Sequence, residues 1–178
     1  MKTKTKHFHS LFIVLLTSST FLLSTASAET NKSAYGYLEP VTLTMHQIAL
    51  TAKLDTGAET ASISAKNILL YEMDGQEYAS FMVAHPELEQ PVHYNLPIVQ
   101  HAKIKKRASE QTQKSRYHSR PVVNMQIQFD GKPHTIMVNL IDRSHFSTPM
   151  LLGRKALKKL NAIVDSTRKN TLLYETNS

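Results

Sequence analysis

The segment with the clearest chemical meaning is Asp55-Thr56-Gly57, which follows an apolar stretch ending at Leu54 and precedes Ala58. An aspartate on a tight loop projects its carboxylate into a cleft. The glycine lets the backbone turn where a side chain would clash, and its amide can donate to the carboxylate. The threonine hydroxyl can bond to a neighbouring loop. We therefore expect Asp55 to be a catalytic carboxylate, with Thr56, Gly57 and Ala58 as its support.

Aspartates that hydrolyse peptide bonds work in pairs. Two adjacent carboxylates share one proton, because two like charges at that distance cannot both ionise. The ionised member takes a proton from water, and the neutral member hydrogen-bonds to the scissile carbonyl. The 178-residue sequence contains one Asp-Thr-Gly and suits one domain. The second Asp55 must then come from a second copy, which predicts a homodimeric aspartic endopeptidase acting on a peptide or protein substrate without a cofactor.

The elements that position this loop are predicted to be mainly strands. Val41, Leu43 and Met45 alternate with polar residues, and a second alternating run, from 48 to 54, leads into Asp55. Two further hairpins are indicated by Asp74-Gly75 and Asp130-Gly131, since an Asp-Gly pair between alternating apolar runs favours a turn with positive φ. Residues 154–160 read as one short helix, and residues 163–164 and 172–174 as closing strands. The pattern predicts an all-β domain with one short C-terminal helix.

Several segments in a fixed order resemble a bacterial family of retropepsin-like aspartic proteases. The segments are Ala52–Ser62, Arg120–Val123, Leu140–Ser144, Met150–Arg154 and Val164–Ser166, and they cover most of residues 40–166. Members are often labelled ATP-dependent zinc proteases, and relatives occur near ribosomal-protein glutamate ligases. The resemblance implies a closed β-barrel of the acid-protease fold, a homodimer and a catalytic role for Asp55.

The resemblance also implies a supporting role for Leu152, Gly153 and Arg154. In such folds an apolar-apolar-glycine strand runs beside the catalytic loop and leads into the helix. Two roles stay open for Arg154, which can bond across the dimer or simply begin the helix. Asp142 and Arg143 leave a similar choice between an ion pair that braces the site and a surface pair of little energetic value.

The zinc and ATP in that family label find no support in the residues. No His-Glu-x-x-His motif and no Gly-x-x-x-x-Gly-Lys-Ser/Thr loop occurs in the sequence. We therefore expect no metal and no cofactor. Two alternatives remain, namely a non-catalytic peptide- or protein-binding module of the same fold in the cell envelope, and a metal-dependent hydrolase that uses histidines in loops.

A basic segment, 101–120, lies between the predicted hairpins and carries seven lysines and arginines. It reads either as a solvated loop or as a cationic rim over a substrate cleft. In the second interpretation Lys105, Lys106 and Arg107 bind acidic or glutamate-containing peptides.

The N-terminal residues 1–28 have the pattern of a secretory signal peptide. Lys2, Lys4 and Lys6 precede an apolar run, and Ala26-Ser27-Ala28 offers a cleavage site before Glu29. The alternative is an uncleaved anchor, although the run is short and interrupted by hydroxyls. Cleavage predicts a periplasmic protein without stable membrane insertion, with a flexible segment over 29–38 and the protease domain over 39–178. It leaves 18 basic and 14 acidic residues, a balance that does not favour nucleic acid binding.

Overall fold

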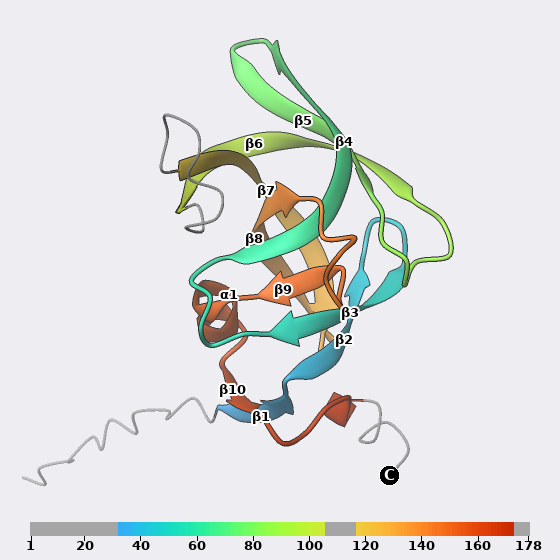
Figure 1. The fold of residues 1–178 in the computed structure, drawn as a ribbon, viewed down its shortest axis with the longest axis vertical. Coiled ribbons are helices and arrows are strands. Elements are labelled where there is room, and N and C mark those ends of the chain that lie inside the picture. Colours follow the sequence, from blue (N-terminus) through green and yellow to red (C-terminus); the bar gives the residue numbers. More distant parts are fainter. Residues whose placement is uncertain (1–31, 106–116, 173–178) are drawn as a thin grey trace, which may run out of the picture.

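The computed structural model describes residues 32–105 and 117–172, and most of them lie in strands (Figure 1). The strands are β1 (Ser33–Gly36), β2 (Leu38–Leu43), β3 (Ile48–Leu54), β4 (Ala61–Met73), β5 (Gln76–Val83), β6 (Val92–Lys105), β7 (Tyr117–Phe129), β8 (Lys132–Ile141), β9 (Met150–Leu152) and β10 (Ala162–Asp165). A short helix, α1 (Arg154–Lys159), follows β9. The predicted all-β fold with one short helix near its C-terminal end is confirmed for this part of the chain.

The main sheet closes on itself. Its strand order is β2-β3-β9-β4-β5-β6-β7-β8, and two further pairings, β2 with β7 and β4 with β8, join strands that are distant in this order. The pairings of β3 with β9 and of β4 with β8 are parallel, whereas the hairpin pairs are antiparallel. The resulting barrel-like sheet leaves few open edges around the core, as the resemblance to closed acid-protease barrels implies.

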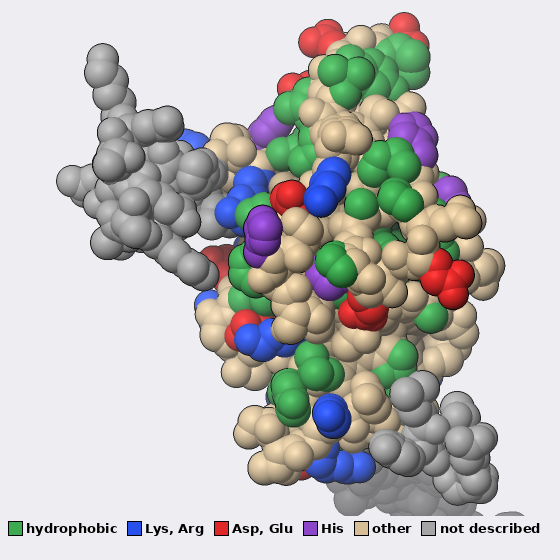
Figure 2. Space-filling view, turned by 45° about the vertical axis from the view of Figure 1, so that its right-hand side comes forward, with side chains coloured by type: hydrophobic (Ala, Val, Ile, Leu, Met, Phe, Trp, Pro, Cys, Tyr) green, Lys and Arg blue, Asp and Glu red, His purple; other side chains and the backbone are tan. Residues whose placement is uncertain are grey.

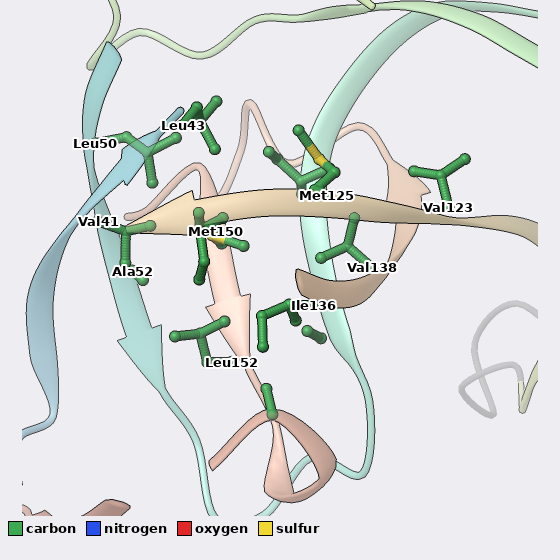
Figure 3. Packing of buried hydrophobic residues seen from close by; sticks show 14 of the residues in the cluster. Val41, Leu43, Leu50, Ala52, Val123, Met125, Ile136, Val138, Met150 and Leu152 are labelled. Carbon is green, nitrogen blue, oxygen red and sulfur yellow. The ribbon is translucent and has the colours of Figure 1, made fainter. Parts of the chain in front are cut away.

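Alternating apolar residues fill the inside of this closed sheet. Figure 3 shows Val41, Leu43 and Leu50 from the first hairpin packed toward Met125 and Met150 from distant strands. All five side chains are buried. Because every second residue of a strand points to the same face, the predicted period of two places these residues together in one core.

The two Asp-Gly hairpins are confirmed. Asp74-Gly75 joins β4 to β5 and Asp130-Gly131 joins β7 to β8, and all four residues have positive φ. This is the geometry of a two-residue turn that matches the twist of its strands. Met45, which was expected to continue the first strand, lies beyond the end of β2 and is exposed.

The N-terminal region is more ordered than the sequence suggested. We predicted a flexible segment over 29–38, but β1 occupies 33–36 and pairs in parallel with β10, and β2 begins at Leu38. The carboxylate of Glu39 is fully buried and accepts hydrogen bonds from the backbone amides of Gly36, Thr171 and Leu172. The β1–β10 pairing joins residues 129 positions apart, and Glu39 and Thr171 are 132 apart, so local patterns could not reveal these contacts. Residues 1–31 lie outside the described residues.

Two other expectations need correction. Residues 101–105 and 117–120 of the basic segment are not loop, because they form the ends of β6 and β7 and pair with each other. These strand ends were not predicted because their side chains are mostly polar or basic and show little of the apolar alternation that marks a strand. Residues 171–172 are helical, not a closing strand, and Leu173 and Tyr174 lie outside the described residues.

The hairpin of β4 and β5 projects from the barrel at the top of Figure 1. Figure 2 shows hydrophobic side chains at this projecting end, where Leu69, Leu70 and Met73 are exposed.

Across the described ranges no helix is long and apolar enough to cross a membrane.

Candidate active site

Asp55 lies at the end of β3, where the backbone leaves the barrel. β3 runs parallel to β9 with Leu54 opposite Leu152, and the Asp55 amide donates to the Leu152 carbonyl at 2.9 Å. Both leucines are buried in the core. The apolar residues on either side therefore fix the point from which the Asp55 side chain projects.

Both oxygens of the Asp55 carboxylate have partners within the chain. The Gly57 amide donates to Oδ1 at 2.9 Å, as predicted, and the Lys53 ammonium lies 3.3 Å from Oδ2. The Asp55 side chain is 26% exposed. Partial burial raises its pKa, but the Gly57 amide, the Lys53 ammonium and the Ala58 amide together outweigh that effect and hold the pKa below its usual value. The isolated chain thus favours an ionised Asp55.

The loop after Asp55 is held by the start of α1. The amides of Arg154 and Lys155 donate to the carbonyls of Ala58 and Glu59 at 2.8 and 3.0 Å. The Arg154 guanidinium donates to the carbonyls of Thr56 and Gly57, both at 3.1 Å. Arg154 therefore braces its own loop, in addition to beginning the helix, and a contact across a dimer stays a prediction.

Gly153 permits this close packing. A Cβ atom at this position would lie 2.5 Å from the Thr60 carbonyl oxygen and 2.9 Å from that of Ala58. The backbone φ of Gly153 is −84°, so its role is steric and not conformational. The expected positions of Leu152, Gly153 and Arg154 beside the Asp55 loop agree with the structure.

Sequence reasoning undervalued Arg143, which is only 5% exposed. Its Nε donates to the Thr148 carbonyl at 3.2 Å, and its Nη1 donates to the Ser62 hydroxyl at 3.1 Å. Its guanidinium also lies over the Phe146 ring. Burial and the charge of Arg120 lower the pKa of Arg143, whereas the charge of Asp55 raises it. Arg143 is therefore a buried cation within electrostatic reach of the Asp55 carboxylate.

Neither reading of Asp142-Arg143 describes the structure, because the two side chains turn apart. Asp142 is exposed, accepts the Ser144 amide at 2.8 Å and lies 3.9 Å from the Lys66 ammonium. A signal for the burial of Arg143 was available in Ser62 and Ser64, which are hydroxyl residues among the apolar residues of β4. Both are buried and bonded to Arg143.

An open hollow of about 610 Å³ lies beside the Asp55 loop. It is formed by the loop itself, by β6 and β7, and by the buried polar residues of β4 and β8. The basic residues that line it are His101, Lys103, Arg120, Arg143 and Lys155, together with one acidic residue, Glu59. Lys155 is paired with Glu59 at 2.9 Å. The charged residues of the lining are therefore mainly basic, whereas the rest of the lining is neutral.

The predicted basic contacts Lys105, Lys106 and Arg107 fall largely outside the described residues. Lys105 is the last residue of β6, and Lys106 and Arg107 lie in 106–116. The described cations of the hollow were not selected from the sequence, apart from Arg143 as half of the supposed ion pair. Arg120 was hard to select because it follows the basic run in sequence but lies opposite Ala102 across the hairpin.

Two of the histidines that were expected in loops lie on a strand instead. His93 and His101 are part of β6, where His93 contacts the Ser80 hydroxyl and His101 pairs with Glu77. His85 does lie in a loop, after β5, and contacts the Phe146 carbonyl. Within 32–105 and 117–172, no group of three or more histidine, cysteine, aspartate or glutamate side chains is arranged to hold a metal ion.

Comparison with known proteins connects this geometry to a family. The model of the RimB-like family, described as retropepsin-like aspartic endopeptidase RimB, matches residues 34–173. The chain belongs to this family. Its fold and the order of its motifs agree with the resemblance noted from the sequence.

Relatives of this chain carry different names. A probable alpha-L-glutamate ligase from Desulfotalea psychrophila is 31% identical over 112 residues, which are 61% of this chain and 23% of the ligase. One from Shewanella pealeana is 30% identical over 111 residues with the same coverage. The match thus spans about a quarter of these ligases. A crystal structure of a Legionella pneumophila protein of unknown function (DUF785) has a TM-score of 0.66 and 34% identity, covering 80% of this chain and 99% of that one.

Proposed function

We propose that this protein is an aspartic endopeptidase that hydrolyses peptide bonds with a water activated by two Asp55 carboxylates across a homodimer. The observation that carries the proposal is the Asp55 loop. It holds a partly exposed carboxylate by the Gly57 amide and rests on the buried Leu152-Gly153 backbone. Membership of the retropepsin-like family supports the same chemistry.

The second carboxylate comes from a second copy in this proposal. A two-fold axis beside the loop sets two Asp55 side chains face to face. Their mutual repulsion raises the pKa of one of them, so that the pair keeps one proton even though each isolated chain favours the ionised form. The ionised Asp55 takes a proton from the attacking water, and the protonated one donates to the scissile carbonyl. The roles reverse when the tetrahedral intermediate breaks down.

Acidic peptides, including glutamate-containing ones, are the proposed substrates. The open hollow beside the Asp55 loop is lined by Lys103, Arg120 and Arg143, and these positive charges attract carboxylates. The glutamate ligase names of the relatives belong to longer proteins, of which this chain matches about a quarter. They are consistent with a substrate rich in glutamate, and Lys105, Lys106 and Arg107 would extend the same cationic surface.

Export to the periplasm is part of the proposal. The basic and apolar pattern before Ala28 supports it. Production of the full chain in a bacterium with a functional secretion system, followed by fractionation and N-terminal sequencing, tests it directly. A periplasmic protein that begins at Glu29 supports export, whereas an intact Met1 in the cytoplasm would contradict it.

The catalytic proposal is tested by exposing an unbiased peptide library to purified residues 29–178 and to the Asp55→Asn variant. Both are assayed from about pH 4 to pH 7, where a carboxylate pair that shares a proton should work. Cleavage by the first protein alone, unaffected by chelator, supports the proposal. Cleavage that survives Asp55→Asn but disappears with chelator would instead favour a metal-dependent hydrolase. Binding without cleavage by a folded dimer would favour a binding module.

A further inference from the structure

Lys53 has an unusual place for a residue outside the catalytic loop. It is two positions before Asp55, so strand alternation sends both side chains toward the same face. The Lys53 ammonium lies 3.3 Å from Asp55 Oδ2, while the Gly57 amide occupies Oδ1. The Lys53 side chain is 45% exposed, so its ammonium remains partly solvated. A full positive charge therefore lies against the carboxylate that has to share a proton.

We propose that Lys53 is a positioning residue that holds Asp55 Oδ2 and sets the pH range in which the pair of Asp55 carboxylates keeps one proton. This inference rests on the proposed function. In a two-fold dimer each copy contributes one Lys53, so two ammonium groups flank two carboxylates. Their charges offset part of the repulsion between the carboxylates, and the singly protonated state then persists to lower pH than in an unflanked pair.

The other charged groups near Asp55 are engaged elsewhere. Arg143 acts on Asp55 through its charge, but its guanidinium donates to the Ser62 hydroxyl and to the carbonyl of Thr148. Arg154 donates to backbone carbonyls of the loop. In the described part of the chain, Lys53 is thus the cation placed in direct contact with the catalytic carboxylate.

The carboxylate of Glu59, on the same loop, changes the net charge around Asp55 little. Glu59 is paired with Lys155 at 2.9 Å, and this ion pair keeps its charge largely compensated. Lys53 also precedes Leu54, which is buried in the core, so the backbone that carries the ammonium is fixed. Replacing the Lys53 side chain should therefore change the charge at Asp55 without moving the loop.

The test compares the pH dependence of kcat/KM for the wild-type mature chain with that of Lys53→Met and Lys53→Arg. The substrate is a peptide that the wild type cleaves. Loss of the charge moves both limbs of the profile to higher pH. We expect kcat/KM of Lys53→Met to be about threefold to tenfold lower on the acid limb, and relatively higher on the alkaline limb. Lys53→Arg should restore most of the wild-type profile.

Lys66→Met provides a matched control. Lys66 is also paired with an aspartate, Asp142, and its side chain is 43% exposed, close to the value for Lys53. Its profile should coincide with that of the wild type. A uniform loss of activity in Lys53→Met at every pH, or an equal shift in Lys66→Met, would overturn the inference.

A second measurement does not depend on activity. Titration of Asp55 by 13C NMR in aspartate-labelled wild type, Lys53→Met and Lys66→Met should show a higher pKa for Asp55 in Lys53→Met only. An unchanged Asp55 titration would refute the role of Lys53 even if the enzyme is active. If the Asp55 pKa is raised in Lys53→Met but the wild type cleaves no peptide, the electrostatic role of Lys53 is supported and the proposed function is contradicted.

Discussion

Gly153→Ala perturbs the contact between the β9–α1 junction and the Asp55 loop without changing Asp55 itself. The new Cβ would lie 2.5 Å from the Thr60 carbonyl oxygen and 2.9 Å from the Ala58 carbonyl oxygen. Ordinary contact requires roughly 3.5 Å, so the two backbone segments have to separate by about 1 Å. Neither neighbour is a flexible side chain that can turn away. Overpacking of this kind costs about 1–3 kcal/mol of stability, and we expect a value near the upper end.

The activity loss follows from the same displacement. The Ala58 carbonyl accepts the Arg154 amide at 2.8 Å, and the Ala58 amide donates to the Asp55 carbonyl at 3.3 Å, so a displacement of Ala58 should be passed on to Asp55. A misplacement of about 1 Å in a catalytic group lowers activity by roughly 100-fold. We expect Gly153→Ala to show this loss in kcat/KM, together with a lower urea midpoint in unfolding followed by circular dichroism.

Gly75→Ala is the matched control for this prediction. Gly75 has a φ of +74°, and a Cβ added there would have no neighbouring atom within 4 Å, so the same chemical change meets strain but no steric clash. It should cost about 1 kcal/mol and leave kcat/KM unchanged. If Gly153→Ala is as stable and as active as Gly75→Ala, the steric account of the Asp55 loop is wrong.

Three further predictions concern stability, and each is measured by urea unfolding. Glu39→Gln replaces a buried carboxylate that accepts several backbone amides, so it should cost about 2–3 kcal/mol, and a neutral effect would refute the role given to Glu39. Arg143→Met leaves the buried Ser62 hydroxyl without its donor and should cost about 2–4 kcal/mol, with a smaller loss in Arg143→Lys. Hydrogen bonds from the following turn lower the pKa of both Asp142 and Asp165 in the folded chain. The two ionised carboxylates therefore stabilise the folded state. This stabilisation is complete above the ordinary aspartate pKa and is lost as the pH falls through the lower folded-state pKa, so the free energy of unfolding should decline below about pH 4. A stability that is independent of pH between about 2 and 5 would contradict this.

The features predicted correctly from the sequence are those encoded by neighbouring residues. The Asp74-Gly75 turn needs only two residues with positive φ between alternating runs, and the Gly57 amide reaches Asp55 because it is two positions away. The short helix after Gly153 was also visible locally. These features defined the Asp55 loop and its immediate support before any tertiary contact was known.

The features that were missed depend on residues far apart in the chain. Arg143 is buried because Ser62 and Ser64 on β4 accept its hydrogen bonds across about 80 positions. The partners of Glu39 include Thr171, which lies 132 positions later in the chain, after the last strand. Basic residues near the ends of β6 and β7 form a strand pair because the antiparallel ladder continues past the apolar part of each strand. No local period carries such information.

The central claim is that one active unit contains two Asp55 carboxylates from two copies of the chain. Mixing tests it most directly: wild type and Asp55→Asn chains are unfolded together in equal amounts, refolded, and assayed for cleavage of a peptide that the wild type cuts. Random pairing leaves about a quarter of the dimers with two Asp55 residues, so activity per wild-type chain should fall to about half. Activity per wild-type chain should fall further as the Asp55→Asn chain is added in excess. Activity per wild-type chain that stays constant at every ratio would show that a single Asp55 suffices, and would contradict the account.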